Sequence, residues 1–161
     1  MNIAFAQPFA HSAFLDRGVS DEAHQIDRIR DLEPLENSFY VLRRQYEILN
    51  GLKDAVAEAS QEDREAFEAY KANSNTLLYT LEFLNRLPTS TPMPEIGLDR
   101  DGEFALDWDC GPRRIISVRV AKDGTLHFAW LVGFSSVHGV EPLTDNIPDA
   151  ILHGLGRVIT F

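Results

Sequence analysis

The stretch that decides the fold runs from Pro94 to Val132 and reads PEIGLDRDGEFALDWDCGPRRIISVRVAKDGTLHFAWLV. Apolar and polar residues alternate along most of it, and a period of two is typical of β-strands with one buried face. Three turn signals interrupt the alternation, with the sequences DRDG at 99–102, CGP at 110–112 and KDG at 122–124. The short spacing between these turns predicts antiparallel strands joined by hairpins.

The turns also predict a register for the strands. Asp-Gly at the end of the first and third turns is typical of three-residue hairpin loops, which we place at 100–102 and 122–124. Across the middle turn we expect Asp109 to oppose Arg113. This register puts the large apolar side chains on one face, whereas a slip by one residue would scatter them over both. The expected pairs are Leu98 with Phe104, Ile96 with Leu106, Trp108 with Arg114, Ile116 with Leu106 and Trp130, Val118 with Phe104 and Phe128, and Val120 with Leu126.

The opposite face of the expected sheet carries the candidate partner-binding residues. The register aligns a row of small side chains across four strands, which forms a trough that another element can approach closely. Either the protein's own N-terminal arm or a helix lies in this trough, or a partner protein docks there. In a charged row beside it, Glu103 is expected to pair with Arg119. The small row is Gly97, Ala105, Ser117 and Ala129, and the candidate set is Glu103, Ala105, Ile115, Ser117, Arg119, His127, Ala129 and Leu131.

The N-terminal half predicts helices. Ser20 is expected to cap a short helix that Pro34 ends or kinks. Apolar residues then recur at steps of three and four over 35–56, the period of an amphipathic helix. A second such helix is expected over 60–87, so that the two form an antiparallel hairpin with both apolar stripes in the core. The stripe of the first is Leu35, Phe39, Leu42, Tyr46, Leu49, Leu52 and Val56.

The two ends of the chain complete the expected fold. A last helix is expected after Asp145 or Asn146 as the cap, with Pro148 in its first turn, covering the apolar side of the sheet. The result is an α+β fold with an N-terminal helical hairpin, a four- to five-stranded antiparallel β-meander, its fifth strand around 137–140, and a C-terminal helix. We expect a helical region over 1–90, and the sheet with the last helix over 91–161, packed as one unit. An extended arm before Gly18 is expected to dock through Phe5, Phe9, Phe14 and Leu15.

Residues that carry chemistry are sparse. The five histidines show no metal-ligand spacing, and no phosphate-binding loop or nucleophile motif is present. We therefore expect no metal, no cofactor and no catalytic residue. The best acid/base candidate is His127 beside Glu103 and Arg119, because an imidazole titrates near neutrality. The single cysteine, Cys110, excludes an internal disulfide framework and favours a cytoplasmic location.

From Pro94 onward the chain resembles a group of uncharacterised small bacterial proteins. The shared features are the Pro-Glu-Ile opening, the Asp-Gly hairpins, the strand ending in Trp, and Gly-x-Glu-Pro followed by Ile-Pro in HGVEPLTDNIPDAIL at 138–152. The resemblance implies a bacterial or phage-related origin and a gene that travels with a second small protein. It brings no catalytic residues.

Three hypotheses for function follow. The first is a non-enzymatic interaction protein, a subunit or regulator that binds another protein. A basic partner and a two-gene or defence-related system belong to this hypothesis. The second is an acidic mimic of nucleic acid that inhibits a DNA- or RNA-binding protein, which charge concentrated along one face would favour. The third is a small enzyme or ligand sensor, which a deep pocket around His127 and Arg119 would favour.

The charge of the chain predicts its behaviour toward DNA. It has 25 acidic and 15 basic residues, a formal net charge of −10, so its field repels nucleic-acid phosphate and anionic membranes. We predict no binding to duplex DNA at physiological salt in a gel-shift titration. A shifted band at submicromolar protein would contradict this.

Overall fold

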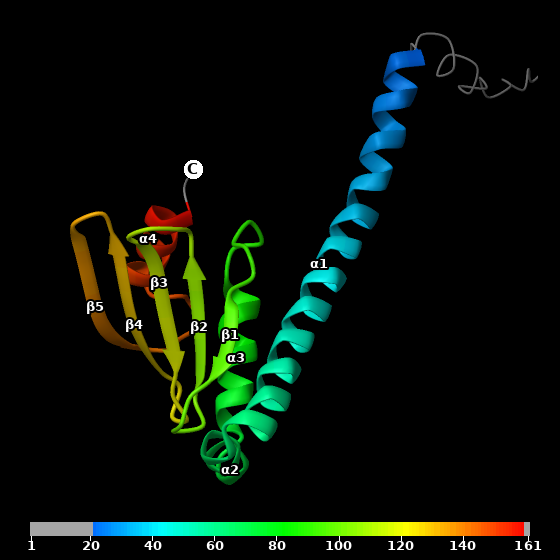
Figure 1. Cartoon of the computed structure of the whole chain (residues 1–161). Helices are drawn as coiled ribbons and strands as arrows, with labels where there is room; N and C mark the ends of the chain where they lie inside the picture. The colour runs from blue at the N-terminus through cyan, green and yellow to red at the C-terminus, as the bar shows by residue number, and fades with distance from the viewer. Residues whose placement is uncertain (1–20, 160–161) are drawn as a thin grey trace, which may run out of the picture. The chain divides into compact units, whose positions relative to one another are not determined.

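The structure is a computed structural model that describes residues 21–159 and their side chains from Glu36 onward. The elements are α1 (Asp21–Glu62), α2 (Arg64–Ala72), α3 (Asn75–Arg86), β1 (Glu95–Leu98), β2 (Phe104–Asp109), β3 (Arg114–Val120), β4 (Thr125–Val132), β5 (Ser135–Pro142) and α4 (Asp149–Ile159) (Figure 1). The chain divides into two units between Tyr40 and Val41. Within the second unit the helices and the sheet share one core.

The strands form one five-stranded sheet in the order β1-β2-β3-β4-β5, with every neighbouring pair antiparallel. The α+β class, the meander and the C-terminal helix are therefore confirmed. The fifth strand is longer than the stretch expected around 137–140. The arm residues Phe5, Phe9, Phe14 and Leu15, and the expected cap Ser20, lie outside the described residues.

The first and third hairpins have the expected three-residue loops. The backbone N–H of Asp99 donates to the carbonyl of Glu103, and that of Ala121 donates to the carbonyl of Thr125. The third loop residues, Gly102 and Gly124, have φ of 75° and 82°, in the left-handed region that glycine adopts without strain. The Asp-Gly signals thus predicted both loops correctly.

The expected register of the middle hairpin is wrong by two residues. Asp109 pairs with Ile115, and the loop is Gly111-Pro112-Arg113, closed by Cys110 N–H donating to the carbonyl of Arg114. A loop over 110–112 would put Pro112 third, at the left-handed position, and its ring holds φ near −65°. Arg113 takes that position instead, with φ of 59°.

The two-residue shift changes partners but keeps every side chain on its face, because side chains alternate with a period of two. The pairs between β3 and β4 and between β1 and β2 are as expected. The corrected pairs between β2 and β3 are Phe104 with Val120, Leu106 with Val118, and Trp108 with Ile116.

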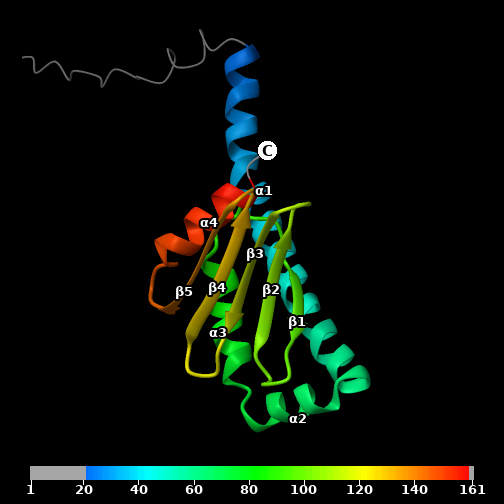
Figure 2. The same ribbon diagram turned by 60° about the vertical axis from the view of Figure 1, so that its left-hand side comes forward.

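The apolar face of the sheet is the core of the Val41–Phe161 unit. The helices α3 and α4 lie on this face (Figures 1 and 2), and α4 contacts β2, β3 and β4 as expected. Successive turns of α1 within this unit also contribute to the core, through Ile48, Leu52 and Ala55. The core residues of the sheet are Phe104, Leu106, Trp108, Ile116, Val118, Val120, Leu126, Phe128 and Trp130.

The helical hairpin is confirmed, but its boundaries differ from those expected. Helix α1 runs from Asp21 to Glu62 without ending at Pro34. Ser60, the expected first residue of the second helix, lies inside α1, where its hydroxyl donates to the carbonyl of Ala57. The turn comes at Asp63, whose carboxylate accepts the N–H of Ala66 at 3.1 Å and caps α2. Helix α3 then returns antiparallel to the C-terminal part of α1 (Figure 1).

Helix α4 approaches the sheet closely at Gly154. A Cβ added there would lie 2.4 Å from Cδ1 of Trp130 and 2.9 Å from Cδ1 of Ile116. At Gly156, two residues later and on the other side of the same helix, a Cβ would meet no atom within 4 Å. The two glycines therefore have different roles, since only the first makes room for the sheet.

We predict opposite effects for the same substitution at these two sites. Gly154→Ala should destabilise the fold by about 1–3 kcal/mol through overpacking against Trp130. Gly156→Ala should stabilise it by up to about 1 kcal/mol, because alanine favours the helix. Urea denaturation of both variants measures this, and equal effects would contradict the close approach.

Candidate interaction surfaces

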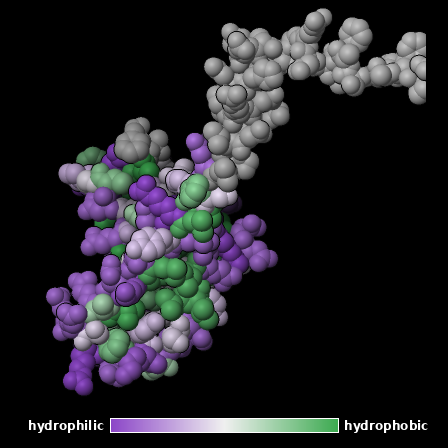
Figure 3. Space-filling view, turned by 90° about the vertical axis from the view of Figure 1, so that its right-hand side faces the viewer, coloured by the Kyte–Doolittle hydropathy of each residue, from purple (hydrophilic) through white to green (hydrophobic). Residues whose placement is uncertain are grey.

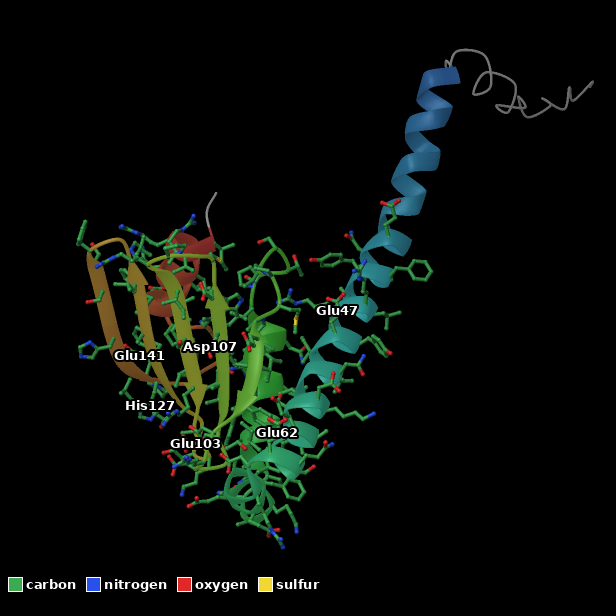
Figure 4. All side chains as sticks on the ribbon, viewed as in Figure 1. Glu47, Glu62, Glu103, Asp107, His127 and Glu141 are labelled. Carbon is green, nitrogen blue, oxygen red and sulfur yellow. The ribbon has the colours of Figure 1, made fainter. Side chains whose placement is uncertain are left out.

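The candidate residues lie on the face of the sheet opposite the core. Ala105 is on β2, Ile115, Ser117 and Arg119 are on β3, and His127, Ala129 and Leu131 are on β4, while Glu103 directly precedes β2. Strand alternation places them there, since their neighbours in sequence are buried core residues. Figure 4 labels Glu103, Asp107 and His127 on this face.

The row of four small residues is not formed. With the corrected register Ala105 opposes Arg119, and Ser117 opposes Asp107, to which its hydroxyl donates a hydrogen bond. Two pairs of the expected row remain, Gly97 with Ala105 and Ser117 with Ala129, but they no longer lie opposite each other. The trough inferred from the sequence is therefore interrupted, by Arg119 beside Ala105 and by Asp107 beside Ser117.

The expected ion pair is also replaced. Arg119 Nε lies 2.8 Å from Oδ2 of Asp99, so its partner is Asp99 and not Glu103. The other carboxylate oxygen of Asp99 accepts the N–H groups of Asp101 and Glu103, which holds the carboxylate over the first hairpin loop. Arg119 thus ties β3 to this loop across the sheet.

A shallow hollow of about 390 Å³ remains on this face, and Asp107, Arg119 and His127 are among its lining residues. It is open, so the deep pocket that would favour an enzyme or a sensor is not seen around His127 in the described chain. Within the described part of the Val41–Phe161 unit, no helix lies over this face (Figures 1 and 2). A solvated face is ordinary for an antiparallel sheet.

The described residues show neither metal-binding nor membrane-spanning features. Among them no three His, Cys, Asp or Glu side chains are grouped to hold a metal ion. From α1 to α4, no helix combines the length and the apolar character that crossing a bilayer requires. Cys110 is exposed in the middle hairpin.

Acidic side chains gather at a second hollow, between the C-terminal part of α1 and strands β1 and β2. This hollow measures about 250 Å³. No pattern in the sequence indicates this cluster, because its members come from separate segments that only the tertiary fold brings together. They are Glu58, Glu62, Asp63, Glu95 and Asp107.

The most unusual surface is on α1. Leu42, Tyr46 and Leu49 are 61%, 68% and 55% exposed, and we call these three residues the α1 stripe. The helical period predicts that all three lie in the core, and this prediction is wrong. The core face of α1 is a neighbouring one, formed by Ile48, Leu52, Ala55 and Ala59. Figure 3 shows hydrophobic residues gathered on the side of the molecule where α1 lies.

A second signal in the sequence marks this other face. Ile48, Leu52, Ala55 and Ala59 also recur at steps of four and three, so α1 carries two apolar faces from residue 42 onward. Only one of them can pack on the sheet. The residues of the stripe expected over 35–56 fall into a buried and an exposed group. Leu52 is buried, while Phe39, one turn before the α1 stripe, is 70% exposed.

Comparison with known proteins finds no matching family model, no matching curated protein and no matching solved structure.

The corrected register makes a prediction about coupling energies. In double-mutant cycles, Asp99 and Arg119 should couple by about 0.2–1 kcal/mol, the usual range for exposed ion pairs. Glu103 and Arg119 should be additive within about 0.3–0.5 kcal/mol, as sites without contact are. Denaturation of Asp99→Asn, Glu103→Gln and Arg119→Gln, alone and combined, measures both. Coupling between Glu103 and Arg119 alone would show that the register expected from the sequence is correct.

Proposed function

We propose that this protein is a non-enzymatic interaction protein, a subunit or regulator that binds another protein helix through the α1 stripe. The observation that carries the proposal is the exposure of Leu42, Tyr46 and Leu49, each more than half exposed beside a well-packed core. Single exposed apolar residues are normal, but adjacent large ones along a helix are typical of binding sites.

The chemistry of the α1 stripe suits helix recognition. Its residues lie at steps of four and three, so they form one ridge along the helix, the arrangement with which a helix contacts another helix. Tyrosine is among the residues that contribute most to interface energy, because its ring is large and it has few rotamers to lose. Burying each leucine would contribute about 1.5–3 kcal/mol.

The wider setting stays a prediction. A cytoplasmic location, a bacterial or phage-related origin and a two-gene or defence-related system are proposals that the resemblance and the cysteine content support. They are compatible with a subunit that is completed by a second protein.

A second candidate is an acidic inhibitor that mimics nucleic acid. The observation in its favour is the hollow lined by Glu58, Glu62, Asp63, Glu95 and Asp107. The two candidates differ in salt dependence, since binding through carboxylates weakens steeply as salt rises whereas apolar burial does not. The α1 stripe is the stronger case, because carboxylates on a surface are ordinary and large apolar residues are not.

Substitution of the α1 stripe tests the proposed function. We predict that Leu42→Glu lowers the amount of co-purified partner at least about tenfold when the tagged chain is captured from its own cells, because burying a charge opposes docking. The matched control is Leu78→Glu on α3, which alters a side chain that is also exposed, at 64%. Both variants should melt like the original protein. Equal capture by the two variants would contradict the proposal.

A further inference from the structure

The two edges of the sheet differ in how they are protected. β1 is four residues long, and α1 packs against it, since a Cβ added to Gly51 would lie 2.9 Å from Cδ1 of Ile96. β5, the other edge strand (Figure 1), is eight residues long and pairs with β4 at eight consecutive positions without a bulge. Edges usually avoid pairing with another chain by being short, by lysine, proline or bulges, or beneath a covering helix. β5 has only a proline, Pro142, as its last residue.

The backbone of β5 presents three N–H groups to the open edge. Leu143, directly after β5, donates its N–H to the carbonyl of Gly124, which directly precedes β4. The backbone groups of a strand point alternately to its two sides, so residues two, four and six positions before Leu143 face β4. The N–H and C=O groups of Ser136, His138 and Val140 therefore face the open edge. All three residues are exposed.

We propose that β5 pairs with β5 of a second copy of this chain, antiparallel and about a two-fold axis at His138. His138 then opposes His138 of the second copy, and Ser136 opposes Val140. Every N–H and C=O group that these three residues present to the edge finds a partner. An axis at Gly139 would set Ser136 opposite Pro142, which has no N–H, and leave a carbonyl unpaired.

This pairing joins the two sheets into one continuous sheet. Residues that oppose each other on antiparallel strands lie on the same face, so both core faces lie on the same side. The same patch serves both chains, as in any two-fold interface. The surface is separate from the α1 stripe, so the inference goes beyond the proposed function and does not rest on it.

Opposite charges at the two ends of β5 favour a second copy as the occupant. Glu141 is near the C-terminal end (Figure 4), while at the other end Cζ of Arg113 lies 4.6 Å from the ring centre of Phe134. Antiparallel pairing puts Glu141 of one copy opposite Ser135 of the other, directly beside Phe134. Each carboxylate then lies near a guanidinium, twice by symmetry. Parallel pairing would instead bring the two Glu141 side chains together.

Pairing also covers apolar side chains that the fold leaves in water. Phe134, Val137 and Val140 are all exposed. In the proposed register Phe134 lies opposite Pro142 of the second copy, and Val140 lies opposite Ser136. Removing such surface from water favours association.

The first experiment measures the mass of the full chain by sedimentation equilibrium at physiological salt, which screens repulsion between the acidic chains beyond about 8 Å. We expect a dimer. His138→Pro should raise its dissociation constant at least about tenfold, because each dimer loses two backbone donors. The matched control, His138→Thr, keeps the N–H and should stay within about threefold. A monomer at all concentrations, or equal dissociation constants for the two variants, would overturn the proposal.

His138→Pro should leave the fold of each chain intact, because proline is tolerated where a strand's N–H faces an open edge. Urea denaturation checks this. A charge exchange tests the same pairing without altering the backbone. Glu141→Lys should raise the dissociation constant about threefold or more, since two ion pairs are lost. Adding Arg113→Glu to the same chain should reverse this effect. Two losses that simply add would reject the antiparallel direction.

The last experiment determines the register by disulfide formation in a Cys110→Ser background. Residues opposed in a hydrogen-bonded pair have Cα atoms about 5.5 Å apart, within disulfide range. His138→Cys should therefore cross-link with itself. Ser136→Cys alone should not, because its partner is Val140. Cross-linking of Ser136→Cys alone, without that of His138→Cys, would reject the axis at His138.

The outcomes separate this inference from the proposed function. A dimer that Tyr46→Glu dissociates and His138→Pro leaves intact overturns pairing through β5 and assigns the interface to the α1 stripe. A monomer whose capture of another protein depends on Leu42 overturns the second copy and leaves the proposed function standing. A dimer that depends on the N–H of His138 supports this inference, even where Leu42→Glu leaves capture unchanged and the proposed function fails.

Discussion

Burial of one face of the sheet is the interaction on which the rest of the structure depends. Phe104, Ile116 and Val118 are fully buried on it, beneath helices that come from both ends of the Val41–Phe161 unit. Because side chains alternate along each strand, this burial assigns every other residue to the opposite face. Gly154 lets α4 lie directly on Trp130, where any side chain would hold the helix away. The outer face, with Arg119 and His127, is polar as a consequence.

Only part of the apolar surface of α1 is buried in this core. Ile48 and Leu52 enter the core, while Leu42 and Tyr46 face away from it. The fold does not require the second group, and water-exposed aromatic and aliphatic side chains contribute nothing to stability where they stand. The binding role that we propose for α1 accounts for their presence.

The candidate site differs from the sequence-based expectation more than the fold does. All eight expected residues lie on the outer face, as alternation requires. Their grouping depended on one hairpin, and a shift of two residues put Arg119 next to Ala105 and Asp107 next to Ser117. A groove inferred from small residues is sensitive to register in this way, since faces survive a two-residue shift but rows do not.

The sequence by itself determined the elements, the faces of the strands and two of the hairpin loops, because these depend on periodicity and on the local freedom of Gly102 and Gly124. The middle loop was also encoded locally, in the fixed φ of Pro112, although the expectation overlooked it. Only the tertiary structure decided which apolar face of α1 is buried, because both faces have the same helical period and the choice depends on what α1 packs against. The acidic hollow between α1 and the sheet is tertiary for the same reason: its carboxylates are distant in the chain and become neighbours only when α1 docks.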